Sequence, residues 1–215
     1  MKEYRKKLVI SIGLLAVFTF WTIVVSFVDV QQIGPQKSSV GLATINQFIH
    51  TLTGVHFTLY RLTDWLGCVP IGVCMGFGIL GLTQWIQRRS FRKVDPSILV
   101  LGVFYIIILA AYLLFEHVII NYRPILINGH LEASYPSSTT LLVMCIMPTA
   151  ILQWNHRIKN KILRKFVIFI SISFIAFMII GRLISGVHWF SDIIGGVLLS
   201  SGLVMLYDYL CHNYK

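Results

Sequence analysis

The chain has 215 residues, of which 56% are hydrophobic and 12% are charged. Because soluble domains carry about 25% charged residues, this composition excludes a disordered chain, a coiled coil and an ordinary cytosolic enzyme. The formal net charge of +10 would suit a nucleic-acid partner. In so apolar a chain we expect no such partner and interpret the charge as the cationic bias of cytoplasmic membrane loops.

Six stretches are long and apolar enough to cross a bilayer, which takes about 20 residues per helix. In chain order these predicted spans are Leu8–Val28, Trp65–Gln87, Ser97–Ile119, Ser138–Trp154, Phe166–Gly186 and Phe190–Leu210. The first follows a basic tail, as in a signal peptide, but it is longer than the apolar region of a cleaved signal. We therefore expect an all-α fold, a bundle of six transmembrane helices forming one domain over residues 1–215.

Basic residues alternate between the two ends of the predicted spans. Fourteen of the 18 Lys and Arg lie in the N-terminal tail, in the loops after the second and fourth spans, and at the C-terminus. By the positive-inside rule, this pattern predicts a multi-pass protein of the cell membrane with both termini in the cytoplasm. The external segment over residues 29–64 is expected to form one or two short helices at the membrane interface.

Polar side chains gather at the external ends of the last four predicted spans. Burial of such groups in a membrane is costly, so they are candidate functional residues. They are Glu116, Arg123, Ser137, Ser138, Thr139, Arg182, His188 and Asp192.

This set of side chains is typical of a phosphate site. Arg123 and Arg182 present paired donors that match phosphate oxygens, and a helix that begins near Ser137 adds free backbone N–H groups. Since His188 and Asp192 are four residues apart, they share one helical face. The aspartate can then bind one imidazole nitrogen and leave the other free to attack.

A metal site is the competing interpretation of His188 and Asp192. It needs a third ligand, for which Glu116, His117 and His130 are the candidates, but none has recognisable ligand spacing to His188. The four cysteines lie in apolar runs without a CxxC pair. We therefore expect no metal or other cofactor.

The segment that contains Arg182, His188 and Asp192 resembles a motif of the type 2 phosphatidic acid phosphatase (PAP2) superfamily of integral membrane lipid phosphatases. That motif, S-R-x5-H-x3-D, matches at Arg182, His188 and Asp192, with Gly181 in place of the serine. The resemblance extends to the helix count and to the order of the motifs over residues 97–210.

The family's other two motifs are altered in this chain. The first, K-x6-R-P, keeps Arg123 and the proline after it but has Glu116 in place of the lysine. The second, P-S-G-H, keeps Ser137 and the proline before it, while Ser138 and Thr139 replace the glycine and the histidine.

The resemblance implies a metal-independent phosphatase that acts on a membrane lipid phosphate at the extracytoplasmic face. His188 would be the nucleophile and form a phosphohistidine, and Asp192 would orient it. Arg123 and Arg182 would bind the phosphate oxygens, helped by the serines at the start of the fourth predicted span, Ser137 and Ser138.

The altered positions bear on the substrate. In the family the histidine at the Thr139 position protonates the leaving group, and a threonine cannot act as an acid at neutral pH. A phosphate monoester leaves readily as an anion because its second pKa is about 6. The sequence therefore favours a lipid diphosphate, such as a polyprenyl diphosphate, over phosphatidic acid.

Two other functions remain open at the level of sequence. A non-catalytic relative would bind a lipid phosphate head group or regulate a partner, although such a protein has little need of a His–Asp pair. A transporter is the third alternative, but no span is visibly broken or repeated. No pattern in the sequence specifies an oligomeric state.

Overall fold

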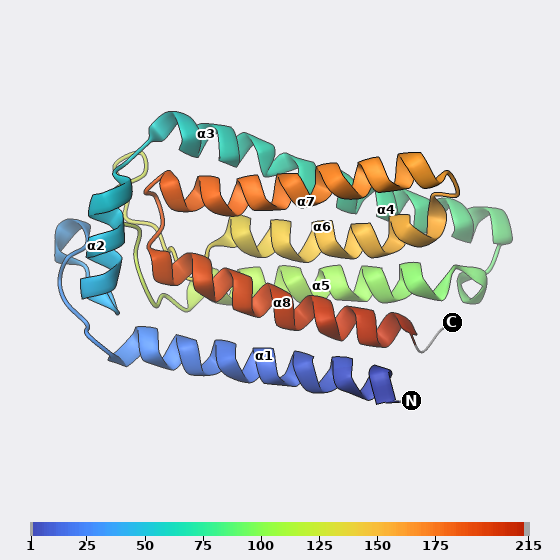
Figure 1. Ribbon diagram of the computed structural model, residues 1–215, viewed down its shortest axis with the longest axis horizontal. Helices are drawn as coiled ribbons and strands as arrows, with labels where there is room; N and C mark the ends of the chain where they lie inside the picture. Colours follow the sequence, from blue (N-terminus) through green and yellow to red (C-terminus); the bar gives the residue numbers. More distant parts are fainter. Residues whose placement is uncertain (1, 213–215) are drawn as a thin grey trace.

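A computed structural model describes residues 2–212 as a bundle of helices joined by short loops (Figure 1). Within this range the elements are α1 (Lys2–Phe27), η1 (Pro35–Lys37), α2 (Ala43–Thr53), α3 (Phe57–Leu66), α4 (Cys68–Arg88), η2 (Phe91–Lys93), α5 (Pro96–His117), α6 (Ser138–Arg157), α7 (Lys161–Ile184) and α8 (Phe190–His212). The described residues form isolated β-bridges but no strand. The predicted all-α class is confirmed.

Five helical stretches within residues 2–212 are long and apolar enough to cross a membrane. They are Arg5–Phe27, Phe57–Arg88, Pro96–His117, Lys161–Ile184 and Phe190–Cys211. The predicted fourth span, α6, is not among them, and its 20 residues include Pro148 and Gln153. Because α6 runs through the centre of the bundle beside α5, α7 and α8 (Figure 1), other helices cover its surface. A full count of six spans therefore stays a prediction.

The second predicted span, Trp65–Gln87, corresponds to α4, within an apolar helical stretch that begins earlier, at Phe57. The structure starts α3 at Phe57 and continues through Gly67, which has helical dihedral angles, into α4. Together they form one apolar stretch of 32 residues. By contrast, α2 lies across the end of the bundle (Figure 1), as expected of an interfacial helix, and exposes Phe48 and Leu52.

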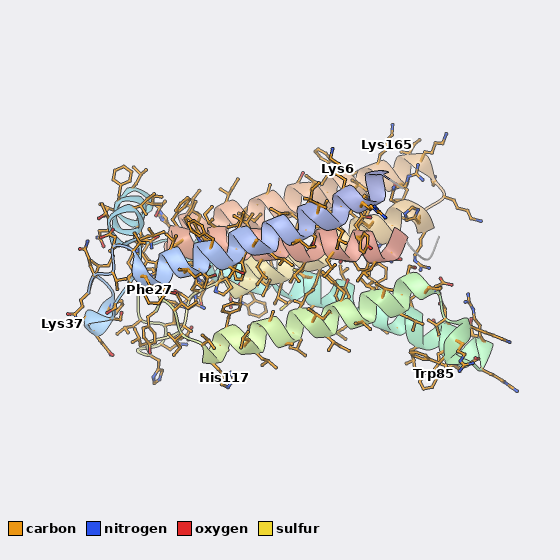
Figure 2. All side chains as sticks on the ribbon, turned by 90° about the horizontal axis from the view of Figure 1, so that it is seen from below. Lys6, Phe27, Lys37, Trp85, His117 and Lys165 are labelled. Atoms are coloured by element: carbon orange, nitrogen blue, oxygen red, sulfur yellow. The ribbon has the colours of Figure 1, made fainter. Side chains whose placement is uncertain are left out.

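The bundle separates a basic end from a polar, less basic end. Lys6 and Lys165 lie at one end with Trp85, whereas Lys37 and His117 lie at the other (Figure 2). The start of α1 and the end of α8 are both at the basic end (Figure 1). The cytoplasmic location of that end stays a prediction.

Helix α1 packs along α8 and fixes the start of that helix. Trp21 donates a hydrogen bond from Nε1 to the Ser191 carbonyl oxygen (3.1 Å), and Ser11 Oγ donates to the carbonyl oxygen of Gly202 (2.8 Å). A hydroxyl–hydroxyl hydrogen bond of 2.8 Å joins Thr22 to the buried Tyr135. These contacts hold α8 and the loop before α6 against one another.

The short α7–α8 loop depends on a glycine. Gly186 has a φ of +68°, and a Cβ built there would lie 2.0 Å from the carbonyl oxygen of Gly54. Most L side chains avoid this conformation, so only glycine allows the loop to pass so closely over the turn between α2 and α3.

We predict that Gly186→Ala destabilises the protein by about 1–3 kcal/mol, since the backbone must shift to relieve the overlap. Thermal unfolding in detergent micelles measures the effect. Gly76→Ala is the control, because a Cβ at Gly76 meets nothing within 4 Å. An unchanged melting temperature for Gly186→Ala would contradict the packing described for this loop.

Candidate active site

Three of the residues singled out from the sequence meet at one nitrogen atom. His188 Nε2 lies 3.1 Å from a terminal nitrogen of Arg182 and 3.3 Å from one of Arg123. Arg182 is in the last turn of α7, Arg123 is in the α5–α6 loop, and His188 is in the α7–α8 loop. Folding thus gathers them from separate segments at the end of the bundle away from the basic loops.

The tautomer of His188 follows from its hydrogen bonds. Its Nδ1 lies 3.2 Å from the Ser134 carbonyl oxygen, which only accepts, so Nδ1 carries the proton and Nε2 offers a lone pair. Burial lowers the pKa of His188 well below its usual value, and the charges of Arg123 and Arg182 lower the pKa further. The imidazole is therefore neutral and nucleophilic at neutral pH.

Asp192 is in the first turn of α8, close to His188 of the preceding loop, but is hydrogen bonded elsewhere. Its Oδ2 is 3.8 Å from His188 Nδ1, which is too far for a hydrogen bond, and the Ser134 carbonyl occupies that position instead. Oδ2 accepts from the backbone N–H of Trp189 (2.9 Å), and Oδ1 accepts from Asn121 Nδ2 (3.2 Å). The expected direct Asp–His hydrogen bond is thus replaced by a longer electrostatic contact.

Arg182 is almost entirely buried and is held by side chains of α3. Its guanidinium lies over the ring of Tyr60, 5.2 Å from the centroid, and one terminal nitrogen is 3.7 Å from Asp64 Oδ1 and 3.5 Å from Thr63 Oγ1. Arg182 Nε has no hydrogen-bond partner among residues 2–212. A buried donor of this kind is costly, and an anion in contact with it would remove that cost.

Glu132 neutralises the second arginine. Glu132 Oε2 lies 3.0 Å from Arg123 Nε, and the two residues also form a backbone hydrogen bond. In residues 2–212 Glu116 forms no ion pair; it is exposed and lines the same cavity as Arg123 and Glu132.

The three residues at the start of α6 point to different places. Ser137 is the N-cap: it is buried, and its Oγ accepts hydrogen bonds from the backbone N–H and the hydroxyl of Thr140. Ser138 lines both the cavity beside His188 and an adjoining apolar groove, whereas Thr139 lines the groove but not the cavity. Of the three, Ser138 therefore has the most direct access to a ligand in the cavity.

The cavity beside His188 has a volume of about 200 Å³, enough for several water molecules. Its wall includes Arg123, Ser134, Ser138 and His188. No group of three His, Cys, Asp or Glu side chains that could hold a metal ion occurs among the residues that the structure describes. Two guanidinium groups beside the imidazole favour an anionic ligand.

Several polar residues of the site were missed from the sequence. They lie in irregular loops or on α3, where neither hydrophobic periodicity nor a sequence motif identifies them. These residues are Tyr60, Thr63, Asp64, Asn121, Glu132 and Ser134. Of these residues, Asn121 was the easiest to identify from the sequence, because it precedes the Arg123-Pro124 pair by two residues. In the structure its amide is fully buried. It also accepts a hydrogen bond from the Gly41 N–H and so joins the α1–α2 segment to Asp192.

Comparison with known proteins agrees with the resemblance seen in the motifs. The family model of the PAP2 superfamily matches residues 71–214. The fold is similar to that of a transmembrane PAP2-type phosphatidylglycerolphosphate phosphatase from Bacillus subtilis, with a TM-score of 0.58, 19% identity, and coverage of 95% of this chain and 97% of that chain. No curated protein sequence matches the chain. At this identity the structural likeness shows the shared fold of a multi-pass membrane protein.

We predict that Arg182→Ala weakens the binding of vanadate, a phosphate analogue, by about 10- to 100-fold, the size of a lost charged hydrogen bond. Equilibrium binding to the purified protein measures this. Arg61→Ala is the matched control, because Arg61 is an exposed arginine on α3 without the contact to His188 Nε2 that Arg182 makes. Equal affinity of the native protein and a folded Arg182→Ala variant would exclude Arg182 from the anion site.

Proposed function

Because the chain belongs to the PAP2 superfamily, we propose that it is a metal-independent lipid phosphatase that hydrolyses a membrane lipid diphosphate at the extracytoplasmic face. The favoured substrate is a polyprenyl diphosphate. The observation that carries the proposal is the contact of both arginines with Nε2 of a buried, neutral histidine. This arrangement supports attack on a phosphorus atom whose oxygens bind the two guanidinium groups.

In the first step Nε2 of His188 attacks the terminal phosphorus atom. The N–P bond forms while the bond from phosphorus to the bridging oxygen breaks, and its electron pair stays on the departing lipid monophosphate. The imidazole ring becomes positively charged. The Ser134 carbonyl, 3.2 Å from Nδ1, and the Asp192 carboxylate, 3.8 Å from it, stabilise that charge.

In the second step water hydrolyses the phosphohistidine. The oxygen of water bonds to phosphorus, the N–P bond breaks, and inorganic phosphate leaves with the ring restored to its neutral form. Arg123 and Arg182 bind the transferred phosphoryl oxygens in both steps. Asn121 holds the Asp192 carboxylate in place through its 3.2 Å hydrogen bond.

Phosphate release by the purified protein tests this proposal. We expect faster release from a polyprenyl diphosphate than from phosphatidic acid, and a decrease of about 10³-fold or more in His188→Ala. His117→Ala is the control, since His117 is an exposed histidine that does not line the cavity. No release from any lipid, together with normal vanadate binding, would replace the proposal by a non-catalytic lipid-binding protein.

Restoring the family's acid tests the leaving-group argument. Thr139 lines the groove next to the cavity, where a lipid leaving group would depart. We expect Thr139→His to accelerate phosphatidic acid hydrolysis by up to about 10²–10⁴-fold, because an alkoxide leaving group needs a proton. The rate with a polyprenyl diphosphate should change little, and equal acceleration of both substrates would refute the argument.

A further inference from the structure

Helix α2, which lies across the end of the bundle (Figure 1), contacts the chain on both sides of His188. Before the histidine, His50 Nε2 lies 3.1 Å from the carbonyl oxygen of Gly186. After it, Asn46 Oδ1 accepts a hydrogen bond from the backbone N–H of Ser191 (3.0 Å). Because Gly186 comes shortly before His188 and Ser191 shortly after it, α2 fixes the backbone on either side of the proposed nucleophile.

Asn46 is fully buried, although its neighbours on α2, Ile45 and Gln47, are exposed. A buried amide is costly unless its polar atoms are hydrogen bonded. Asn46 Nδ2 donates to the carbonyl oxygen of Gly41 (2.8 Å) and to Ser191 Oγ (2.9 Å), and Oδ1 accepts from the Ser191 N–H. Both amide protons and the amide oxygen are therefore used, so this position requires the shape and polarity of asparagine.

The contacts of Asn46 belong to a closed ring of hydrogen bonds. Asn121 Nδ2 donates to Ser191 Oγ (3.3 Å), and Asn121 Oδ1 accepts from the Gly41 N–H (3.1 Å). Asn46 closes the ring, because it bonds to both Ser191 and Gly41. The second amide proton of Asn121 goes to Asp192 Oδ1 (3.2 Å). The ring therefore sets the orientation of Asn121 and, through it, the position of the Asp192 carboxylate.

The position of this carboxylate matters because it acts on the imidazole without a hydrogen bond. Asp192 Oδ2 lies 3.8 Å from His188 Nδ1. The attraction between two charges falls with distance, and it is stronger in a buried site than in water. Misplacing a group by about 1 Å can slow an enzyme by about 100-fold. By contrast, Arg123 and Arg182 have partners outside the ring, so a disturbed ring would leave the phosphate-binding groups in place.

From these contacts we infer that Asn46 is a positioning residue for the Asp192 carboxylate. It acts through Ser191 and Asn121, and it keeps the carboxylate where it stabilises the charge that forms on His188. The inference rests on the proposed function and adds to it a residue that does not line the cavity. Asn46 also lies outside residues 71–214, the region that the PAP2 family model matches.

Phosphate release from a polyprenyl diphosphate by purified Asn46→Ala tests the inference. We expect kcat to fall by about 10- to 100-fold while KM and the affinity for vanadate stay within about twofold, because the arginines keep their own partners. Gln47→Ala is the matched control with native kcat, since Gln47 is an exposed amide on the same helix. A vanadate affinity that falls in proportion to kcat would show a general role in the fold. That result, or an unchanged kcat, would overturn the inference.

Ser191→Ala is a second, milder variant, which decides the question if Asn46→Ala does not fold. It removes only the hydroxyl on which the two amides converge, and the backbone of Ser191 keeps its hydrogen bonds to Asn46 and Trp21. We expect kcat to fall by about 3- to 10-fold, the size of one hydrogen bond, with KM unchanged. A native kcat in this variant would contradict the route from Asn46 to Asp192.

A spectroscopic measurement separates this inference from the proposed function, because it needs no turnover. In protein isotopically labelled at its histidine ring nitrogens, the nuclear magnetic resonance signal of His188 is the one missing from His188→Ala. We expect Asn46→Ala and Ser191→Ala to shift that signal, because Asp192 lies beside the imidazole, and Gln47→Ala to leave it in place. If the native protein releases no phosphate, the proposed function fails. A shifted His188 signal would still support the placement of Asp192 by Asn46, and an unshifted one would refute it.

Discussion

Two guanidinium groups contact the same imidazole nitrogen, and the rest of this end of the bundle depends on that arrangement. Like charges so close together are unfavourable, most of all around the almost fully buried Arg182. The surroundings lower this cost with Glu132 and Asp64 as counter-charges and with the ring of Tyr60 under Arg182. A phosphate between the arginines would complete the balance, and burial together with the same charges lowers the pKa of His188 and keeps it neutral.

The scaffold supplies these groups from many segments. Helix α1 and the α1–α2 segment hold α8 and Asn121 in place, and α3 supports Arg182. The α5–α6 loop contributes Arg123 and the carbonyl oxygen of Ser134. Because α3 begins before residue 71, part of the support for Arg182 lies outside the region that the PAP2 family model matches.

The sequence predicted those parts of the structure that repeat or have a fixed spacing. Apolar runs predicted the helices, and the four-residue spacing predicted that His188 and Asp192 lie close together, although His188 precedes α8 and does not share its face. Predictions that depended on contacts between segments were less accurate. The length of an apolar run did not reveal that α3 continues into α4, or that α6 is covered by its neighbours. The hydrogen bond from His188 to the Ser134 carbonyl could not be predicted, because an irregular loop brings a backbone atom to that position.

The central claim is that His188 becomes phosphorylated during turnover. Rapid acid-free quenching with a lipid diphosphate labelled in its terminal phosphate, followed by mass spectrometry, measures this most directly. We expect a phosphoryl group on His188 that is stable in base and lost in acid, as is typical of a phosphoramidate bond, and that is absent from His188→Ala. Phosphate release without label on His188, or with label on another residue, would contradict the account.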